Sequence, residues 1–255
     1  MKNIIFAFLL TLSIAHAEVN TAVYNITDNT TVSGTLNQRE MSIASISKLM
    51  TVYTILASNL DLSETVTVES TLHNHTKLKV GMQLTRKELV EMALVASDNL
   101  AAMTLADTYP GGRSQFVFMM NSNATQLGMN STKFVEPTGL SPMNISTLED
   151  ISILTQVVSE YSAIRTAAQT DSVKTTLEIN NRTRQVVSKP TSRYFGKDGI
   201  VAIKTGFTKA AGYCITILVK SNERMYNIVV LGAKTPAERE KMVQQGMKNI
   251  NKENL

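Results

Sequence analysis

Apolar and polar positions follow two different periods along this chain, and the two periods occupy separate blocks. Alternation with a period of two, or short β-branched runs, appears near the start and again after residue 165. The first block predicts a hairpin, because Ala22–Ile26 and Thr31–Leu36 flank the turn-forming pair Asp28-Asn29. The second block predicts strands at about Val173–Ile179, Arg184–Val187, Ile200–Lys204, Tyr213–Val219 and Asn227–Gly232.

Helical spacing of apolar residues dominates between these blocks. A helix is expected from near Ser45 to about Leu56, and Thr85-Arg86-Lys87-Glu88 is a capping box that opens a helix ending near Ser97. Thr235-Pro236-Ala237-Glu238 combines an N-cap, Pro at the first helical position and Glu at the third. Further helices are expected at Asn99–Thr108, at about Ser114–Leu127, from Thr147 onward, and from Thr235 to about Ile250.

The order hairpin, helices, strands, helix indicates an α+β fold with its helices and strands in segregated blocks. We expect a largely antiparallel sheet that is closed by the first hairpin and covered by the terminal helix. No repeat or low-complexity linker interrupts the 255 residues. The pattern therefore predicts a single domain over residues 18–255.

The first residues have the composition of an export signal. Lys2 precedes the apolar run Ile4–Leu10, and Ala15-His16-Ala17 has the form of a cleavage site. A buried N-terminal helix or a membrane anchor is the alternative, but the run is short for a bilayer span. We expect residues 1–17 to be a cleavable signal peptide, and no membrane anchor to remain after its removal. The protein would then be secreted across the inner membrane into the periplasm or beyond.

Charge and cysteine content exclude some classes of function. The formal net charge is +4, with no block of Lys and Arg residues, so nucleic acid is not an expected partner. Cys214 is the only cysteine, so no intramolecular disulfide can form. Its β-rich neighbourhood favours a role in core packing.

Three short motifs carry the candidate chemistry: Ser45-Ile46-Ser47-Lys48, Ser97-Asp98-Asn99 and Lys204-Thr205-Gly206. Each alone is weak, because a capping Ser with an exposed Lys, a polar helix end and a strand-to-turn junction are all common. Together and in this order they match the set used by penicillin-binding proteins and class A β-lactamases. The ordered set therefore predicts acyl transfer through a serine.

The first motif suits nucleophilic catalysis. Ser45 at a helix N-terminus gains from free backbone N–H groups and the positive end of the dipole. Lys48 is three residues away on the same face, and burial near a second cation, which we expect to be Lys204, would lower its pKa enough to accept the Ser45 proton.

The other motifs suit substrate handling. Ser97 would pass a proton to the leaving amine, Asn99 would hold the substrate amide, and Asp98 would be structural. Lys204 and Thr205 can bind a substrate carboxylate, and Gly206 lets the substrate backbone approach the strand. The N–H groups of Ser45 and Phe207 would form an oxyanion hole, in which each donor contributes about 3–4 kcal/mol.

Histidine chemistry is poorly supported. Beyond His16 the chain has only His73 and His75, with no nucleophile elbow and no third metal ligand. Exposed loop histidines are the better interpretation, and we expect neither a metal nor another cofactor.

Longer segments around the motifs resemble the low-molecular-mass penicillin-binding proteins, most closely the periplasmic D-alanyl-D-alanine endopeptidase branch. The resemblance runs from about residue 20 to about 235 and is carried by Ile43–Thr51, Tyr109–Gly112, Leu127–Thr132, Phe134–Leu140 and Lys204–Cys214. It implies a β-lactamase/transpeptidase-like fold, with an antiparallel sheet and a helical cluster on its faces. It also implies a serine D-Ala-D-Ala peptidase, endopeptidase or carboxypeptidase, that acts on peptidoglycan peptides and takes β-lactams as covalent inhibitors.

The same resemblance implies the roles given above for Ser45, Lys48, Ser97, Asn99, Lys204 and Thr205. Two alternatives stay open. A class A β-lactamase would need a Glu after the second motif to activate a deacylating water, and Glu136 lies at a plausible place. A non-catalytic wall protein that binds β-lactams could keep the same Ser45 site.

Overall fold

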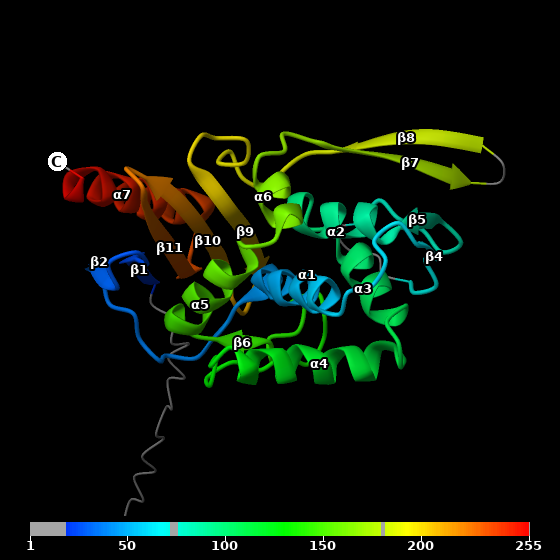
Figure 1. The fold of residues 1–255 in the computed structure, drawn as a ribbon, viewed down its shortest axis with the longest axis horizontal. Coiled ribbons are helices and arrows are strands. Elements are labelled where there is room, and N and C mark those ends of the chain that lie inside the picture. The colour runs from blue at the N-terminus through cyan, green and yellow to red at the C-terminus, as the bar shows by residue number, and fades with distance from the viewer. Residues whose placement is uncertain (1–18, 72–75, 180–181, 255) are drawn as a thin grey trace, which may run out of the picture.

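The computed structural model describes residues 19–71, 76–179 and 182–254 (Figure 1). The expected signal peptide, residues 1–17, lies outside the described residues, as do His73 and His75. None of the described helices is long and apolar enough to cross a membrane.

A five-stranded antiparallel sheet forms one side of the molecule, in the order β2-β1-β11-β10-β9. The chain's first strand pairs with its last, with Asn20 opposite Leu231 and Asn25 opposite Tyr226, so the sheet closes only when both ends of the described chain are in place. β9 has a neighbour on one side only, which leaves its other edge free to line a site. The strands are β1 (Asn20–Asn25), β2 (Thr30–Gly34), β9 (Ile200–Thr208), β10 (Gly212–Ser221) and β11 (Arg224–Ala233).

Helices α5 (Leu148–Val158) and α7 (Pro236–Glu253) pack on opposite faces of this sheet. On one face Thr155 of α5 shares a buried hydroxyl hydrogen bond of 2.8 Å with Thr216 of β10. On the other face a Cβ at Gly246 of α7 would lie 3.1 Å from side-chain atoms of Val23 and Ile228. Successive residues of a strand point to opposite faces, so both helices can bury apolar strand side chains.

The remaining helices cluster beside the free edge of β9 (Figure 1). A short 3₁₀ turn, η1 (Ala44–Ile46), leads into α1 (Ser47–Ala57), which lies among the other helices with most of its side chains buried. The predicted capping box at Thr85 is present, with Thr85 Oγ1 accepting from Glu88 N and the Glu88 carboxylate accepting from Thr85 N. The other members are α2 (Arg86–Val95), α3 (Asn99–Asp107) and α4 (Gly112–Gln126).

Several small elements have no counterpart in the sequence prediction. The pairs β3 (Met41–Ser42) with β6 (Ile145–Ser146) and β4 (Thr65–Thr67) with β5 (Gln83–Thr85) are too short to show a period. Helix α6 (Ser162–Ala168) is also short. The strands β7 (Val173–Ile179) and β8 (Arg182–Ser188), by contrast, were both predicted; they form a hairpin that is separate from the main sheet and extends over α2 (Figure 1).

The α+β class and the antiparallel sheet with helices on its faces are confirmed. Two boundaries matter for the site. The helix expected to begin near Ser45 begins at Ser47, and Ser45 itself lies in the 3₁₀ turn just ahead of it. The predicted end of β9, at about Lys204, is wrong: β9 continues to Thr208, so all of Lys204-Thr205-Gly206 lies within the edge strand.

Candidate active site

The backbone that carries Ser45 is strained. Ala44 has φ +47°, a left-handed conformation that costs a non-glycine residue about 1–3 kcal/mol. Gly139 packs directly against it: a Cβ at Gly139 would lie 1.8 Å from the Ala44 carbonyl oxygen and 2.8 Å from Ser45 N. The turn that presents Ser45 is therefore held from outside by a position that only glycine can occupy.

Lys48 lies one helical turn after Ser45 and is fully buried. Its Nζ is 2.9 Å from Ser45 Oγ, 2.7 Å from Asn99 Oδ1 and 2.7 Å from the Thr138 carbonyl oxygen. The Asn99 and Thr138 oxygens can only accept hydrogen bonds, whereas a hydroxyl can also donate. Ser45 is therefore the one of these three partners that can hand a proton to a neutral Lys48.

Lys204 from β9 is also fully buried. Its Nζ donates to Ser97 Oγ at 2.8 Å and to the Thr205 carbonyl oxygen at 2.9 Å. Ser97 itself has φ +56°, whereas at the first motif the strained residue is Ala44, directly before Ser45. The three motifs thus meet in two lysine–serine pairs, Lys48 with Ser45 and Lys204 with Ser97.

Burial sets the protonation of both lysines. Desolvation lowers the pKa of Lys48 to about 7, against smaller raising contributions from the charges of Glu136 and Asp98. The pKa of Lys204 is held well below its usual range by desolvation and then by the positive charge of Lys48. A neutral amine at Lys48 is therefore available near neutral pH, which is what a general base for Ser45 requires.

The Asp98 carboxylate holds the second motif in place through hydrogen bonds. It is buried and caps α3, because its Oδ1 accepts from the N–H groups of Leu100 and Ala101 at 2.9 and 3.0 Å. It also accepts from Thr76 Oγ1 at 2.9 Å and from Lys77 N at 3.0 Å. The structural role expected for Asp98 agrees with these contacts.

Glu136 binds the backbone of its own loop. One carboxylate oxygen accepts from Thr138 N at 2.7 Å and Thr138 Oγ1 at 2.5 Å, and the other accepts from Gly139 N at 2.7 Å. These bonds fold the loop so that the Thr138 carbonyl faces Lys48 and Gly139 faces Ala44. A carboxylate with this many donors suits a structural role better than the activation of a water.

Asn144 ties the same loop to the start of α1. Its Nδ2 donates to Ser47 Oγ at 3.0 Å and to the Glu136 carbonyl at 2.8 Å, while Oδ1 accepts from Val135 N at 2.8 Å. Its carbonyl accepts from Ile43 N at 3.2 Å. Sequence reasoning gave Asn144 no part in the site, because a lone Asn carries no motif signal.

Gly206 serves close packing within the protein. A Cβ there would lie 2.8 Å from Ser45 N and 3.0 Å from the Ile43 carbonyl, so the glycine lets β9 lie against η1. The expectation from sequence concerned approach of a substrate instead. Because Phe207 follows directly, the two N–H groups expected to form an oxyanion hole belong to backbone segments in contact.

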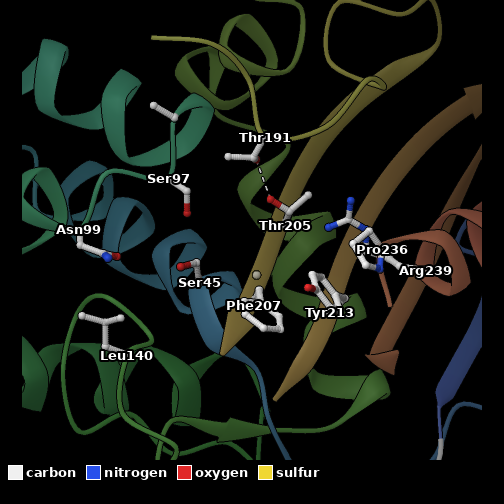
Figure 2. Close-up of a pocket in the computed structure, with 12 residues that line it drawn as sticks. Ser45, Ser97, Asn99, Leu140, Thr191, Thr205, Phe207, Tyr213, Pro236 and Arg239 are labelled. Carbon is white, nitrogen blue, oxygen red and sulfur yellow. Dashed lines mark hydrogen bonds between the residues drawn. The ribbon is translucent and has the colours of Figure 1, made fainter. Parts of the chain in front are cut away.

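These groups open onto a cleft of about 310 Å³ (Figure 2). Ser45, Ser97 and Asn99 line it from the helical side, and Thr205, Phe207 and Tyr213 line it from β9 and β10. The Phe207 and Tyr213 rings are stacked with centroids 4.1 Å apart. The buried Lys48 and Lys204 amine groups lie behind this surface and reach it through the hydroxyls of Ser45 and Ser97.

Sequence reasoning missed two polar side chains of the cleft. Thr191, from the segment before β9, accepts a 2.6 Å hydrogen bond from Thr205 Oγ1 (Figure 2). Arg239, from the first turns of α7, lines the same end. The Glu240 carboxylate forms ion pairs with Arg239 at 3.2 Å and with Arg193 at 3.1 Å. No local sequence pattern marks either residue, because the fold brings them to Thr205.

The arrangement can perform acyl transfer. It offers a hydroxyl next to a neutral amine, a second hydroxyl next to a second lysine, backbone N–H groups beside the nucleophile, and a cationic end suited to a carboxylate. Among the described residues, no group of His, Cys, Asp and Glu side chains could hold a metal ion.

Comparisons with known proteins point the same way. A family model described as D-alanyl-D-alanine carboxypeptidase matches residues 15–235. The chain is 36% identical over 198 residues to the D-alanyl-D-alanine endopeptidase of Escherichia coli K12, which covers 75% of this chain. The chain spans only 63% of the length of that relative.

Two solved structures show the same fold. A mutant form of the Streptomyces K15 DD-transpeptidase superposes with a TM-score of 0.80 at 25% identity, covering 90% of this chain and 95% of the other. Penicillin-binding protein D2 of Listeria monocytogenes, in its cefotaxime-bound form, superposes with a TM-score of 0.77 at 26% identity and the same coverage.

We predict that Gly139→Ala destabilises the protein more than Gly128→Ala does. Both glycines have positive φ, +81° and +79°, so both variants carry a backbone cost of about 1 kcal/mol or more. Only at Gly139 would the new methyl also collide with the Ala44 carbonyl, since nothing lies within 4 Å of a Cβ at Gly128. Chemical denaturation measures both; equal losses would contradict the packing described for the Ser45 turn.

Proposed function

The chain belongs to the D-alanyl-D-alanine carboxypeptidase family, Peptidase_S11, and from that premise we propose that it is a serine acyl-enzyme peptidase of peptidoglycan. It cleaves D-alanyl peptide bonds in stem peptides and in the cross-links between them. The observation that carries the proposal is the pair of buried lysines, each bonded to a serine of a different motif around one cleft.

Acylation starts with a proton transfer from Ser45 Oγ to the neutral Lys48 Nζ, 2.9 Å away. The oxygen attacks the substrate carbonyl carbon, and the oxyanion is stabilised by the N–H groups of Ser45 and Phe207. When the C–N bond breaks, the proton on Lys48 passes to the leaving amine through the hydroxyl of Ser97, which Lys204 holds at 2.8 Å, so Lys48 is neutral again. Asn99, bonded to Lys48, orients the substrate amide.

Deacylation reverses the sequence with water as nucleophile. Lys48 takes a proton from the water, the hydroxide attacks the ester carbonyl, and Ser45 leaves and recovers its proton. No metal or organic cofactor is needed for either step, because all proton transfers run between groups of the chain, substrate and water.

The carboxylate of the leaving group fits the end of the cleft formed by Thr205, Thr191 and Arg239. Lys204 lies directly behind Thr205, and a bound carboxylate would favour its protonated form. Terminal D-alanine carries such a carboxylate, and so does the D-centre of a cross-linked diamino acid. The same site can therefore act as a carboxypeptidase and as an endopeptidase.

A cyclic amide that acylates Ser45 keeps its leaving group attached, which is why β-lactams fit this chemistry as covalent inhibitors. The cefotaxime-bound form of the Listeria neighbour supports that assignment. We further propose that residues 1–17 direct secretion and that the enzyme works on the outer side of the inner membrane. The wall polymer is its substrate, and the acidic character of that polymer suits the net charge of 4 − 1 = +3 that remains once residues 1–17, with Lys2, are removed.

The substrate assignment is tested with purified protein, cross-linked muropeptide dimer and monomeric pentapeptide, with products resolved by mass. We expect the dimer to be converted to monomers and terminal D-alanine to be released from pentapeptide. Ser45→Ala should lower both rates by about 1,000-fold or more, because the nucleophile is lost. Unchanged rates in Ser45→Ala, or inert substrates with the wild type, would contradict the proposal.

The rate of acylation should depend on pH through Lys48. Only the neutral amine accepts the Ser45 proton, so a pKa of about 7 predicts that the rate increases about tenfold between pH 6 and pH 8. Stopped-flow acylation by a chromogenic β-lactam measures this limb. Lys48→Arg should be at least about 100-fold slower and show no step near pH 7, since guanidinium stays protonated. A wild-type rate that falls with pH would overturn the role of Lys48.

The variant Glu136→Gln distinguishes between the two possible functions, a peptidase and a class A-like β-lactamase. If Glu136 folds its loop, the amide variant loses about 1–3 kcal/mol of stability and slows acylation, because an NH₂ group faces N–H donors. Glu160→Gln, at an exposed position, is the matched control and should change neither. Normal acylation with selective accumulation of the acyl-enzyme in Glu136→Gln would instead favour the lactamase.

A further inference from the structure

A second hollow lies beyond the cleft, on the far side of Ala96. It has a volume of about 270 Å³ and is lined by Thr76, Lys77, Ala96, Asp98, Ser188 and Lys189. Ala96 also lines the catalytic cleft, so the two spaces share a wall. A further hollow of about 460 Å³ continues from Thr76 and Lys77 along the outer side of β8, past Lys79. We call the two together the basic groove.

The groove is positively charged. Lys77, Lys79 and Lys189 are exposed along it. The Lys77 ammonium is anchored, because its Nζ donates to the Val187 carbonyl at 2.6 Å. Asp98 is the one acid among the residues that line these hollows in the described chain, and its oxygens already accept four hydrogen bonds from Thr76, Lys77, Leu100 and Ala101. An incoming anion therefore meets three cations, of which one is fixed in place.

The position of the groove relates it to one half of the substrate. The carboxylate end of the cleft contains Thr191, whose N–H donates to the Val95 carbonyl, directly before Ala96. Lys189 lies two residues before Thr191 on the same segment. A chain that continues past a carboxylate held at Thr205 would thus pass Ala96 and reach Lys189 and Lys77. This is the leaving-group side of the scissile bond.

We propose that the basic groove binds the leaving peptide strand of a cross-linked substrate, an acidic peptide that extends beyond the carboxylate at Thr205. The inference rests on the proposed function. In the carboxypeptidase reaction the leaving group is a single D-alanine, which ends at that carboxylate and does not reach the groove. In the endopeptidase reaction the leaving group is a whole stem peptide with further carboxylates. The groove therefore favours cross-link cleavage without taking part in the chemistry.

The test compares two substrates on charge-reversed enzyme. In the double variant Lys77→Glu/Lys189→Glu, we expect the KM for muropeptide dimer to rise by about tenfold or more, because attraction becomes repulsion. Release of D-alanine from monomeric pentapeptide should change by no more than about twofold. The neutral double variant Lys77→Gln/Lys189→Gln should have a dimer KM between those of the wild type and the charge-reversed variant. Added salt should reduce the difference in dimer KM between these enzymes, since exposed charges are screened.

Lys241→Glu/Lys248→Glu is the matched control, with the same change of net charge at exposed positions of α7. It should leave both substrates unaffected. Thermal unfolding of each variant shows whether it is folded. Three results would contradict binding of the leaving strand in the groove: an equal loss of activity on both substrates, an equal effect in the α7 control, or an unchanged dimer KM. None of them would contradict the proposed peptidase activity. Wild-type enzyme that processes neither substrate would overturn the proposed function, and the inference with it.

Discussion

Two lysine side chains, Lys48 and Lys204, are completely buried close to one another, and the rest of the site is arranged around that constraint. Burying an ammonium is costly, and burying two without a paired carboxylate is costlier still. The structure responds with oxygen acceptors for each amine and with a lowered pKa for both. That response makes Lys48 a base near neutral pH.

Holding two buried amines in place requires rigid surroundings. The Thr138 carbonyl faces Lys48 only because Glu136 and Asn144 fix the loop that carries it. Close backbone packing at Gly139 and Gly206 sets the position of Ser45 relative to β9. Residues far apart in sequence thus stabilise one strained turn, which is how a fold can hold unfavourable backbone at a reactive serine.

The fold class and the three motifs could be predicted from sequence, because both depend on local signals. β7 has the predicted bounds Val173–Ile179, and the capping box at Thr85 forms as expected. The remaining site residues could not be found in this way. Thr138 acts through its backbone carbonyl, Asn144 through contacts with distant segments, and Arg239 only because α7 returns to the cleft. Short paired strands such as β3 and β6 carry no period at all.

The most direct test of this account is the protonation of Lys48 itself, measured by NMR titration of protein with isotope-labelled lysine side chains and assigned with Lys48→Arg. Because burial outweighs the nearby negative charges, the account predicts that the Lys48 resonance titrates with a pKa of about 7. An ordinary lysine pKa, above about 9.5, would contradict it, because the amine next to Ser45 would then be charged when the enzyme has to act.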